Sequence, residues 1–153
     1  MSPEERRERI KSYGRAYDRL EAVLVDFPKE MWMWRAGPSD WTIHEIIVHL
    51  ADSEANSYVR CRRFIAEPGS DVLGYEETRG AGALSDQGES ATEALELFRR
   101  LRQSSYALIR SLPDAVWANT VVHSESGRMT FDDWLLTYER HVPEHIAQMR
   151  AIY

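Results

Sequence analysis

Two stretches of the sequence repeat one pattern, and this internal repeat limits the folds that the chain can adopt. Residues 27–32 (FPKEMW) match residues 112–117 (LPDAVW), and residues 41–47 (WTIHEII) match residues 129–135 (MTFDDWL). The offsets are 85 positions, from 28 to 113, and 88 positions, from 42 to 130. Each half therefore reads as a helix, a Pro-x-x-x-Trp connector and a second helix. Because neither half can bury its apolar seam alone, the repeat predicts two helical hairpins packed as a four-helix bundle.

Apolar periodicity places the four helices along the chain. Apolar side chains at three- and four-residue intervals predict helices over about 3–27, 42–65, 90–111 and 130–152. Capping boxes, formed by Thr42 with Glu45 and by Ser90 with Glu93, mark two of the helix starts. The predicted fold class is all-α: a four-helix bundle built of two pseudo-repeated helical hairpins, in one domain over residues 1–153.

Three features interrupt this helical pattern. Residues 119–129 predict a short β-hairpin with its turn at residues 124–127. Residues 67–89 hold five glycines and few periodic apolar side chains, which indicates a lid, a binding loop or a mobile connector. Gly14 lies off the apolar seam, so we expect it to weaken the first helix without moving the seam.

The tryptophans and arginines of this pattern have simple interpretations. The large rings of the first connector, at positions 32, 34 and 41, are interpreted as caps on the end of the core rather than as ligand-stacking groups. The arginines of the third helix, at positions 99, 100, 102 and 110, are interpreted as a solvated face.

Composition and charge argue against several classes of function. The formal net charge is −6 at pH 7, so the chain lacks the electrostatic footprint of a nucleic-acid-binding protein. No apolar run reaches membrane-spanning length, and residues 1–7 show no apolar segment of a secretory signal. Cys61 is the single cysteine, which allows no intramolecular disulfide and fits a reducing compartment. We therefore expect a soluble cytoplasmic protein with neither nucleic acid nor membrane as a partner.

Cys61 lies between Arg60 and Arg62, and two interpretations of it stay open. The neighbouring charges would lower the pKa of the thiol and make it reactive. A lone cysteine in a helix is, however, more often inert packing. No serine or cysteine nucleophile constellation is visible elsewhere in the sequence.

Two histidines near the end of the chain and one in the second predicted helix are the candidate metal ligands. His141 and His145 lie one helical turn apart on one face and can bind a single cation. His49 lies at the edge of the apolar stripe of its own helix. Equivalent helices of the two halves would bring the three together. The alternative is that these histidines only pack in the core or on the surface.

The expected chemistry of such a site depends on its open position and its neighbours. Three neutral imidazoles leave a fourth coordination position for water or for a substrate thiolate or carbonyl. Zinc, nickel or iron would suit three nitrogens. Asp52, one turn beyond His49, is predicted to orient that imidazole, and Glu139 and Glu144 are further candidates for this role.

Two observations limit the site. Pro143 stands between His141 and His145, where it predicts a kink or a break that would tilt the two rings. His44 and His123 are expected to lie outside the site, since neither falls on the same face as the candidate ligands.

The sequence resembles the DinB-like superfamily, which includes metal-dependent hydrolases and thiol-dependent S-transferases. The resemblance is carried by residues 41–43 (WTI), residues 48–54 (VHLADSE) and the segment from Gly127 to Tyr138, which leads into His141-x-x-x-His145. It implies a four-helix bundle, a metal site at His49, His141 and His145, and a homodimer.

Two classes of function follow from these observations. The first is a metalloenzyme that uses the three-histidine site to attack a small electrophilic substrate. Thiol-dependent S-transfer from a low-molecular-weight thiol is its leading form and hydrolysis its second. The alternative is a non-catalytic bundle that binds metal, or one that only interacts with other proteins.

Overall fold

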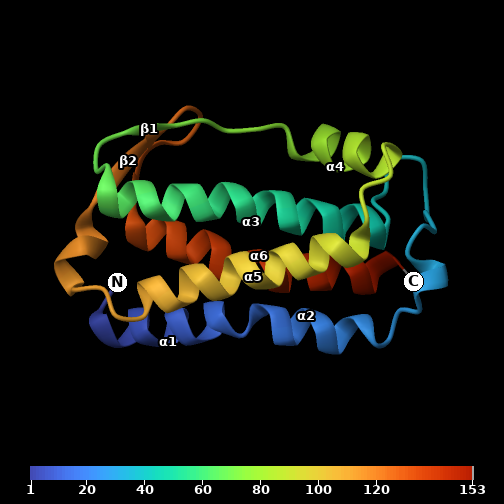
Figure 1. The fold of residues 1–153 in the computed structure, drawn as a ribbon, viewed down its shortest axis with the longest axis horizontal. Coiled ribbons are helices and arrows are strands. Elements are labelled where there is room, and N and C mark those ends of the chain that lie inside the picture. Colours follow the sequence, from blue (N-terminus) through green and yellow to red (C-terminus); the bar gives the residue numbers. More distant parts are fainter. Residues whose placement is uncertain (153) are drawn as a thin grey trace.

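The computed structural model describes residues 1–152 and confirms the predicted four-helix bundle (Figure 1). One position of the bundle is filled by two consecutive helices and the other three by one long helix each. They are α1 (Pro3–Gly14) with α2 (Ala16–Leu24), α3 (Ile43–Ala66), α5 (Ala91–Ile109) and α6 (Phe131–Ile152). None of these described helices is long and apolar enough to cross a membrane.

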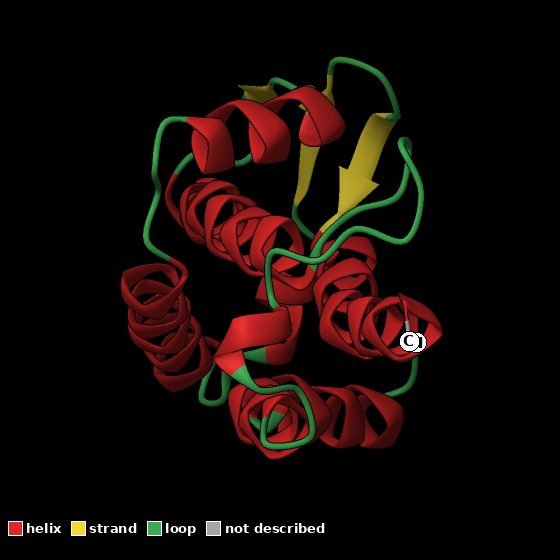
Figure 2. Cartoon of the chain, turned by 90° about the vertical axis from the view of Figure 1, so that its right-hand side faces the viewer, coloured by secondary structure: helices red, strands yellow, loops and turns green. Residues whose placement is uncertain are grey.

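The two halves of the repeat are interleaved rather than placed side by side. Helix α3 packs against α5 and α6, and α1 packs against the same two helices. Viewed from one end, the helices surround a common core (Figure 2). The first and second helices of each half therefore occupy opposite corners of the bundle. The second helices of the two halves, α3 and α6, become antiparallel neighbours, as the repeat suggested.

The segment between α3 and α5 is more regular than the sequence indicated. Because α3 and α5 run in the same direction, the chain must return along the length of the bundle between them (Figure 1). On this return it forms β1 (Asp71–Val72) and then α4 (Glu77–Asp86). Helix α4 packs on the first half of α3, where His44 Nδ1 lies 2.8 Å from Ser85 Oγ.

The first predicted helix is interrupted at Arg15, which lies between α1 and α2 with φ −92° and ψ 0°. The interruption coincides with a close approach to α5. A Cβ added to Gly14 would lie 2.7 Å from the ring of Tyr106, so only glycine lets the two helices meet here without a shift.

A short sheet closes one end of the bundle. The predicted hairpin is confirmed as β2 (Thr120–His123) paired with β3 (Gly127–Thr130) in antiparallel register. Strand β1 adds to β2 in parallel, which the sequence did not predict. Nδ1 of His123 accepts hydrogen bonds from the backbone N–H groups of Glu125 and Ser126, so this histidine closes the hairpin turn.

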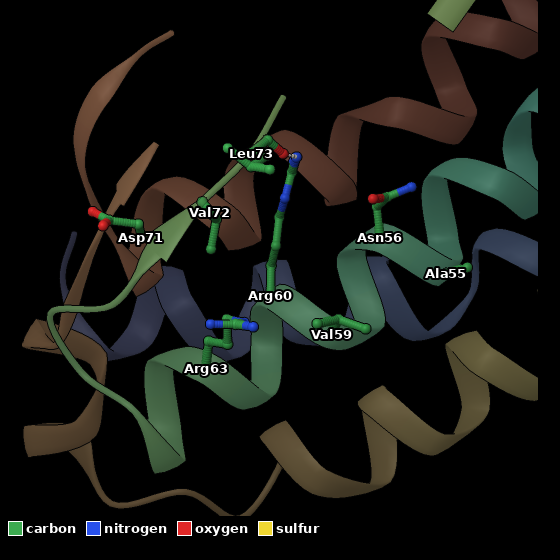
Figure 3. A pocket seen from close by; sticks show the side chains of 8 residues that line it. All are labelled: Ala55, Asn56, Val59, Arg60, Arg63, Asp71, Val72 and Leu73. Carbon is green, nitrogen blue, oxygen red and sulfur yellow. Dashed lines mark hydrogen bonds between the residues drawn. The ribbon is translucent and has the colours of Figure 1, made fainter. Parts of the chain in front are cut away.

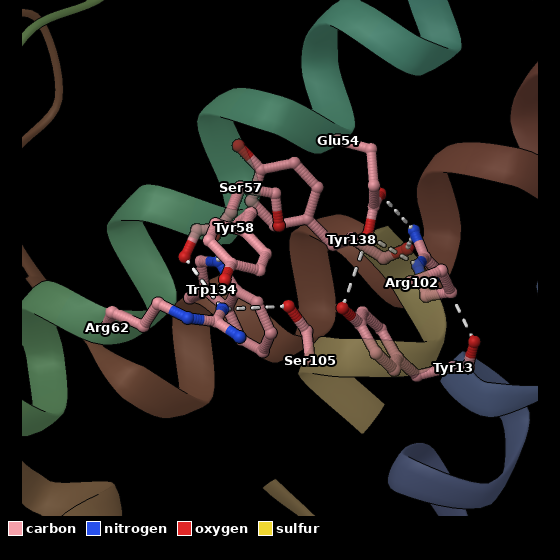
Figure 4. A network of polar contacts seen from close by, with 9 residues as sticks. All are labelled: Tyr13, Glu54, Ser57, Tyr58, Arg62, Arg102, Ser105, Trp134 and Tyr138. Carbon is pink, nitrogen blue, oxygen red and sulfur yellow. Dashed lines mark hydrogen bonds and ion pairs between the residues drawn. The ribbon is translucent and has the colours of Figure 1, made fainter. Parts of the chain in front are cut away.

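The core has two apolar clusters, one toward each end of the bundle. Trp32 belongs to one cluster, as expected for a cap on the core, and Trp117 of the second connector belongs to the other. The Trp34 side chain, which was expected to cap the core as well, is instead 48% exposed. Between the clusters lies a polar layer built around Glu54 and Arg102 (Figure 4).

The interpretation of the α5 arginines as a solvated face is wrong for Arg102. Its side chain is only 1% exposed and forms a bidentate ion pair with Glu54, at 2.7 and 2.8 Å. The same guanidinium donates to the carbonyl oxygens of Tyr13 and Tyr138. All four corners of the bundle therefore meet at this ion pair. Arg102 lies in line with Phe98 and Ser105 on the buried face of α5, which explains its burial.

Candidate metal centre

The three histidines singled out from the sequence converge where α3 passes α6. His141 Nε2 lies 3.0 Å from His49 Nε2 and 3.1 Å from His145 Nε2. One nitrogen from each of the three rings lies within 4.8 Å of the others. His49 is buried, and the other two are partly buried. The structure thus brings the three together, and their role as metal ligands stays a prediction.

Pro143 does not break the helix that carries two of these histidines. Helix α6 continues through it from Phe131 to Ile152, and the His141 and His145 rings remain one turn apart with their Nε2 atoms facing each other. Pro143 itself is exposed, so its ring occupies no space in the core. The predicted break is therefore absent, and the two rings still meet.

Burial keeps the three imidazoles neutral. It lowers the pKa of His49 to about 4, with a further contribution from the charge of His145. It lowers the pKa of His141 to about 2, where His145, His49 and Arg102 add to the effect. The pKa of His145 is also lowered by burial, although the hydrogen bond to Gln148 opposes the shift. At pH 7 all three rings are therefore in the form that binds metal.

The arrangement of nitrogens fits a cation. A neutral imidazole has one N–H group and one lone pair, so three Nε2 atoms that face one another cannot all be satisfied by mutual hydrogen bonds. A single cation satisfies all three lone pairs at once. Two nitrogens that each bind one zinc ion at about 2.1 Å in tetrahedral geometry lie about 3.4 Å apart, close to the separations of 3.0 and 3.1 Å seen here.

The Nδ1 atoms of the three rings differ in their hydrogen-bond partners. His145 Nδ1 lies 2.7 Å from Gln148 Oε1, which can accept its proton and leave Nε2 free to bind metal. His49 Nδ1 and His141 Nδ1 are buried without a hydrogen-bond partner among the described residues. The sequence analysis missed Gln148. Its spacing of three residues from His145, on the same helix face, was the signal that could have identified it.

The carboxylates predicted to help these rings are not bonded to them. Because His49 Nδ1 has no partner, Asp52 does not accept its proton in this arrangement. The Asp52 carboxylate instead lies close to α4, 3.9 Å from a Cβ built on Gly80. Glu144 is exposed and acts on His145 only through its charge, and Glu139 pairs with Arg9.

Trp41 covers the histidines from the connector before α3. Its ring centroid lies 5.2 Å from that of His49, edge to face, and 6.2 Å from that of His145, stacked. The ring therefore packs on the candidate ligands themselves rather than only on the end of the core. The side chain is partly exposed, so it stands between the site and solvent.

The other histidines and the cysteine lie outside the site. His44 contacts Ser85 and His123 closes a turn, as expected. Cys61 is fully buried, and burial raises the pKa of its thiol to about 12 even though Arg62 acts in the opposite direction. The thiol is therefore inert packing and not a nucleophile.

Comparisons with known proteins agree with this architecture. A sequence model of the family described as "DinB superfamily" matches residues 12–149. A protein of Oceanobacillus iheyensis is 27% identical over 133 residues, which cover 87% of this chain and 77% of that protein. YfiT of Bacillus subtilis is 27% identical over 113 residues, which cover 73% of this chain and 64% of YfiT. Both relatives carry the name "putative metal-dependent hydrolase".

A solved structure shares the fold. It is that of YfiT from Bacillus subtilis, described as a four-helix bundle with an unusual topology. The two chains superpose with a TM-score of 0.89 at 22% identity, over 99% of this chain and 87% of the other.

Proposed function

Because the chain belongs to the DinB superfamily, we propose that it is a metal-dependent enzyme whose reaction takes place at His49, His141 and His145. The observation that carries the proposal is the convergence of three neutral imidazoles, one buried and two partly buried, with their Nε2 atoms facing one another. A divalent metal held there would supply Lewis acidity, which lowers the pKa of a nucleophile or polarises an electrophile.

The protein's own residues have defined tasks in this proposal. The three Nε2 atoms hold the metal, and Gln148 keeps His145 in the tautomer that leaves Nε2 free. Trp41 packs on two of the rings and limits the access of water. Three protein ligands, rather than four, are typical of catalytic zinc sites, which keep a position for the reactants.

Hydrolysis of a small electrophilic substrate is the form of the reaction that the names of the relatives support. Thiol-dependent S-transfer is the second candidate. The hydrogen bonds of the three rings are to one another and to Gln148, and the carboxylates whose charges act on His145 are Glu77 and the exposed Glu144. A thiol, with an ordinary pKa of about 8.5, needs less help from a general base than water does.

The further expectations about partners belong to the same proposal. The substrate is a small molecule, the protein works as a homodimer in the cytoplasm, and nucleic acid is not a partner. The acidic net charge of −6 supports the last point. Sedimentation equilibrium of the full chain tests the dimer, and a monomer at all concentrations up to about 100 μM would reject it.

Metal content tests the site directly. Protein purified without a polyhistidine tag is loaded with zinc, nickel or iron(II), dialysed, and its metal content is measured by elemental analysis. We expect one metal per chain in the wild type and a loss in His49→Ala, His141→Ala and His145→Ala. His123→Ala is the matched control, since that histidine lies in the hairpin turn, and it should keep the metal.

Turnover separates an enzyme from a bundle that only stores or senses metal. The loaded protein is screened against small esters and alkyl halides, with and without added thiol, and product and free thiol are both measured. Product without thiol consumption supports hydrolysis, and equal loss of thiol and electrophile supports S-transfer. A wild-type chain that binds metal but turns over neither class supports the non-catalytic alternative, and one that takes up no metal rejects the site.

A further inference from the structure

A cavity lies beside the C-terminal half of α3, further along the helix than the three histidines. It has a volume of about 510 Å³ and lies between α3 and the chain around β1. Figure 3 shows Arg60 rising from α3 across this space, with Arg63 one turn away and Asn56 on the other side. The reaction proposed at the histidines uses none of these side chains.

The charge of the cavity is unusual for this protein. Two of its lining side chains are arginines and one, Asp71, is acidic, whereas the whole chain carries a net charge of −6. No ion pair among the described residues joins Asp71 to either arginine, and Figure 3 shows its carboxylate turned away from Arg60. Arg63 has only a long contact of 3.8 Å with Glu67, whose side chain is 62% exposed. The cavity therefore presents positive charge.

Arg60 is fixed in place and still has hydrogen atoms to donate. Its Nη1 donates to the hydroxyl of Tyr138 at 3.1 Å, and its Nη2 donates to the carbonyl oxygen of Leu73. A guanidinium has five N–H donors, so these two bonds leave others for a ligand. Because the two bonds hold the guanidinium rigid, an anion would meet a preorganised partner and lose little entropy in ordering it.

The cavity and the histidines lie along one face of α3. His49, Asn56 and Arg60 are separated by seven and four residues, which places them on one side of the helix. The distance from His49 to Arg60 is about 16 Å along the helix axis. Asn56 Nδ2 donates to the carbonyl oxygen of Asp52, and the Tyr138 ring lies edge-on to His141 at 6.2 Å. The first contact lies within α3, and the second joins the Arg60 partner Tyr138 to a candidate ligand.

A buried polar group lies on the segment that joins the cavity to α4. The segment after β1 runs along α3 toward α4 (Figure 1), and it carries Tyr75. Burial raises the pKa of the Tyr75 hydroxyl to about 12, and a hydrogen bond with the Ser53 side chain on α3 acts in the opposite direction.

We propose that this cavity binds the anionic end of the molecule that reacts at the three histidines, and that Arg60 and Arg63 hold its carboxylate or phosphate group. The proposal rests on the function proposed above and adds a substrate class to it. The ligand is an elongated small molecule with its reactive group at one end and an oxyanion on the order of 10 Å or more away. Guanidinium groups suit carboxylate and phosphate because their paired N–H donors match paired oxygens.

Two matched thiols test this proposal on the full chain. Glutathione has a thiol and two carboxylates, and its diethyl ester has the same thiol with both carboxylates blocked. Binding of each to the zinc-loaded protein is measured by titration calorimetry at low ionic strength. We expect the wild type to bind glutathione at least about tenfold more tightly than the diester, because hydrogen bonds to charged groups typically contribute that much. Added salt should reduce this preference.

Three variants assign the preference to the cavity. Arg60→Gln and Arg63→Gln should each weaken glutathione binding by about tenfold and leave diester binding unchanged. Arg62→Gln is the matched control, because Arg62 carries the same charge on the same helix but bonds to Ser104 and Ser105 on α5. Arg63→Gln also controls for an indirect effect of Arg60→Gln on the chain around β1. Arg60 bonds to the carbonyl oxygen of Leu73, so its replacement removes a contact that holds this chain, whereas Arg63 has no bond to Leu73. The metal content of all three variants should equal that of the wild type.

The outcomes separate this proposal from the function on which it rests. Equal wild-type affinities for the two thiols, no binding of glutathione, or a preference that survives in the Arg60→Gln/Arg63→Gln double variant would overturn the anion site. Failure of the proposed function appears differently, as a protein that takes up no metal. S-methylglutathione, which has both carboxylates but no free thiol, is therefore titrated into metal-free protein. Binding that Arg63→Gln weakens would support the anion site even then.

Discussion

Gln148 is the residue on which the orientation of His145 depends. Its Oε1 atom lies 2.7 Å from His145 Nδ1, and no other described side chain bonds to that nitrogen. Replacement by leucine keeps the approximate size but removes the acceptor. We expect Gln148→Leu to weaken metal binding by about 10–100-fold, the usual effect of losing such a partner. Competition with a chromogenic chelator measures the affinity.

Two further variants are measured beside Gln148→Leu, one as a control and one as a comparison. Gln103→Leu changes an exposed glutamine on α5 and should leave metal affinity unchanged. Asp52→Asn tests the carboxylate predicted from the sequence to orient His49, which is not bonded to it here. If Asp52→Asn weakens binding as much as Gln148→Leu does, Asp52 reaches His49 in solution. Unchanged affinity in Gln148→Leu would show that the glutamine does not orient the ligand.

Cys61 gives a prediction about reactivity. The thiol is fully buried and burial raises its pKa to about 12, so at pH 8 almost none of it is thiolate, the form that reacts. We expect the folded protein to react with Ellman's reagent at least about 100-fold more slowly than a free cysteine of pKa about 8.5. Unfolding in urea should restore the full rate. Rapid reaction of the native protein would mean that the neighbouring arginines activate the thiol after all.

The position of Pro143 in α6 leads to a prediction about the stability of the protein. It lies in the interior of α6, lacks the N–H group that would bond to the carbonyl of Glu139, and is exposed. A proline in such a position costs about 3 kcal/mol relative to alanine. Pro143→Ala removes that cost and loses no core packing, so the free energy of unfolding should rise by about 1–3 kcal/mol in urea denaturation.

The metal affinity of the same variant shows what the proline does for the site. If a bend at Pro143 sets the approach of His145 to His141, Pro143→Ala should weaken metal binding while it stabilises the fold. Unchanged affinity would mean that the bend is incidental. A lower free energy of unfolding would contradict the helix-interior argument itself. Ala147→Pro, in the next turn at an exposed position, is a control that should destabilise the helix.

The sequence predicts the helices well where one face is repeatedly apolar and poorly where packing decides. Capping boxes and apolar spacing identified the starts of α3 and α5 directly. Helix α4 carries Gly80 and Gly82 and few large apolar side chains, and it packs on α3, which is distant in sequence. The interruption at Arg15 was also missed, and it coincides with the close approach of Tyr106 on α5 to Gly14.

For the site, local spacing and the repeat were enough to bring three histidines together. His141 and His145 are one turn apart on any helix, and the repeat makes their helix the counterpart of the one that carries His49. Hydrogen-bond partners could not be predicted in the same way. Whether Gln148, Asp52 or Trp41 contacts a given ring depends on side-chain rotamers and on how the connector folds back, which spacing does not specify.

At the scale of the whole molecule, the bundle is organised around one buried ion pair. Glu54 and Arg102 are each only 1% exposed and lie between the two apolar clusters. Tyr13 Oη donates to Glu54, and Arg102 donates to backbone carbonyls of α1 and α6 (Figure 4). Each of the four corners therefore contributes a group. The sequence signal was a charge on the buried stripe of α5, matched by Glu54 on the buried stripe of α3.

This ion pair predicts a strong and non-additive effect on stability. Arg102→Met leaves the Glu54 carboxylate buried without its counter-ion, and breaking a buried pair in this way typically costs about 3–5 kcal/mol. Replacing both charges, in Arg102→Met/Glu54→Leu, removes the uncompensated charge and restores an apolar layer. Such double replacements are often neutral or stabilising relative to the intact pair. We therefore expect the double variant to be more stable than Arg102→Met alone, by about 2 kcal/mol or more.

Urea denaturation of the wild type, the two single variants and the double variant gives the four free energies of this cycle. Glu96→Ala is the control, because its pairs with Arg99 and Arg100 lie on the exposed surface of α5 and should contribute little to the free energy of unfolding. If the losses in the two single variants simply add in the double variant, the two charges do not stabilise each other. In that case the layer would be held by its separate hydrogen bonds to Tyr13 and Tyr138, and the ion pair would not be what joins the four corners of the bundle.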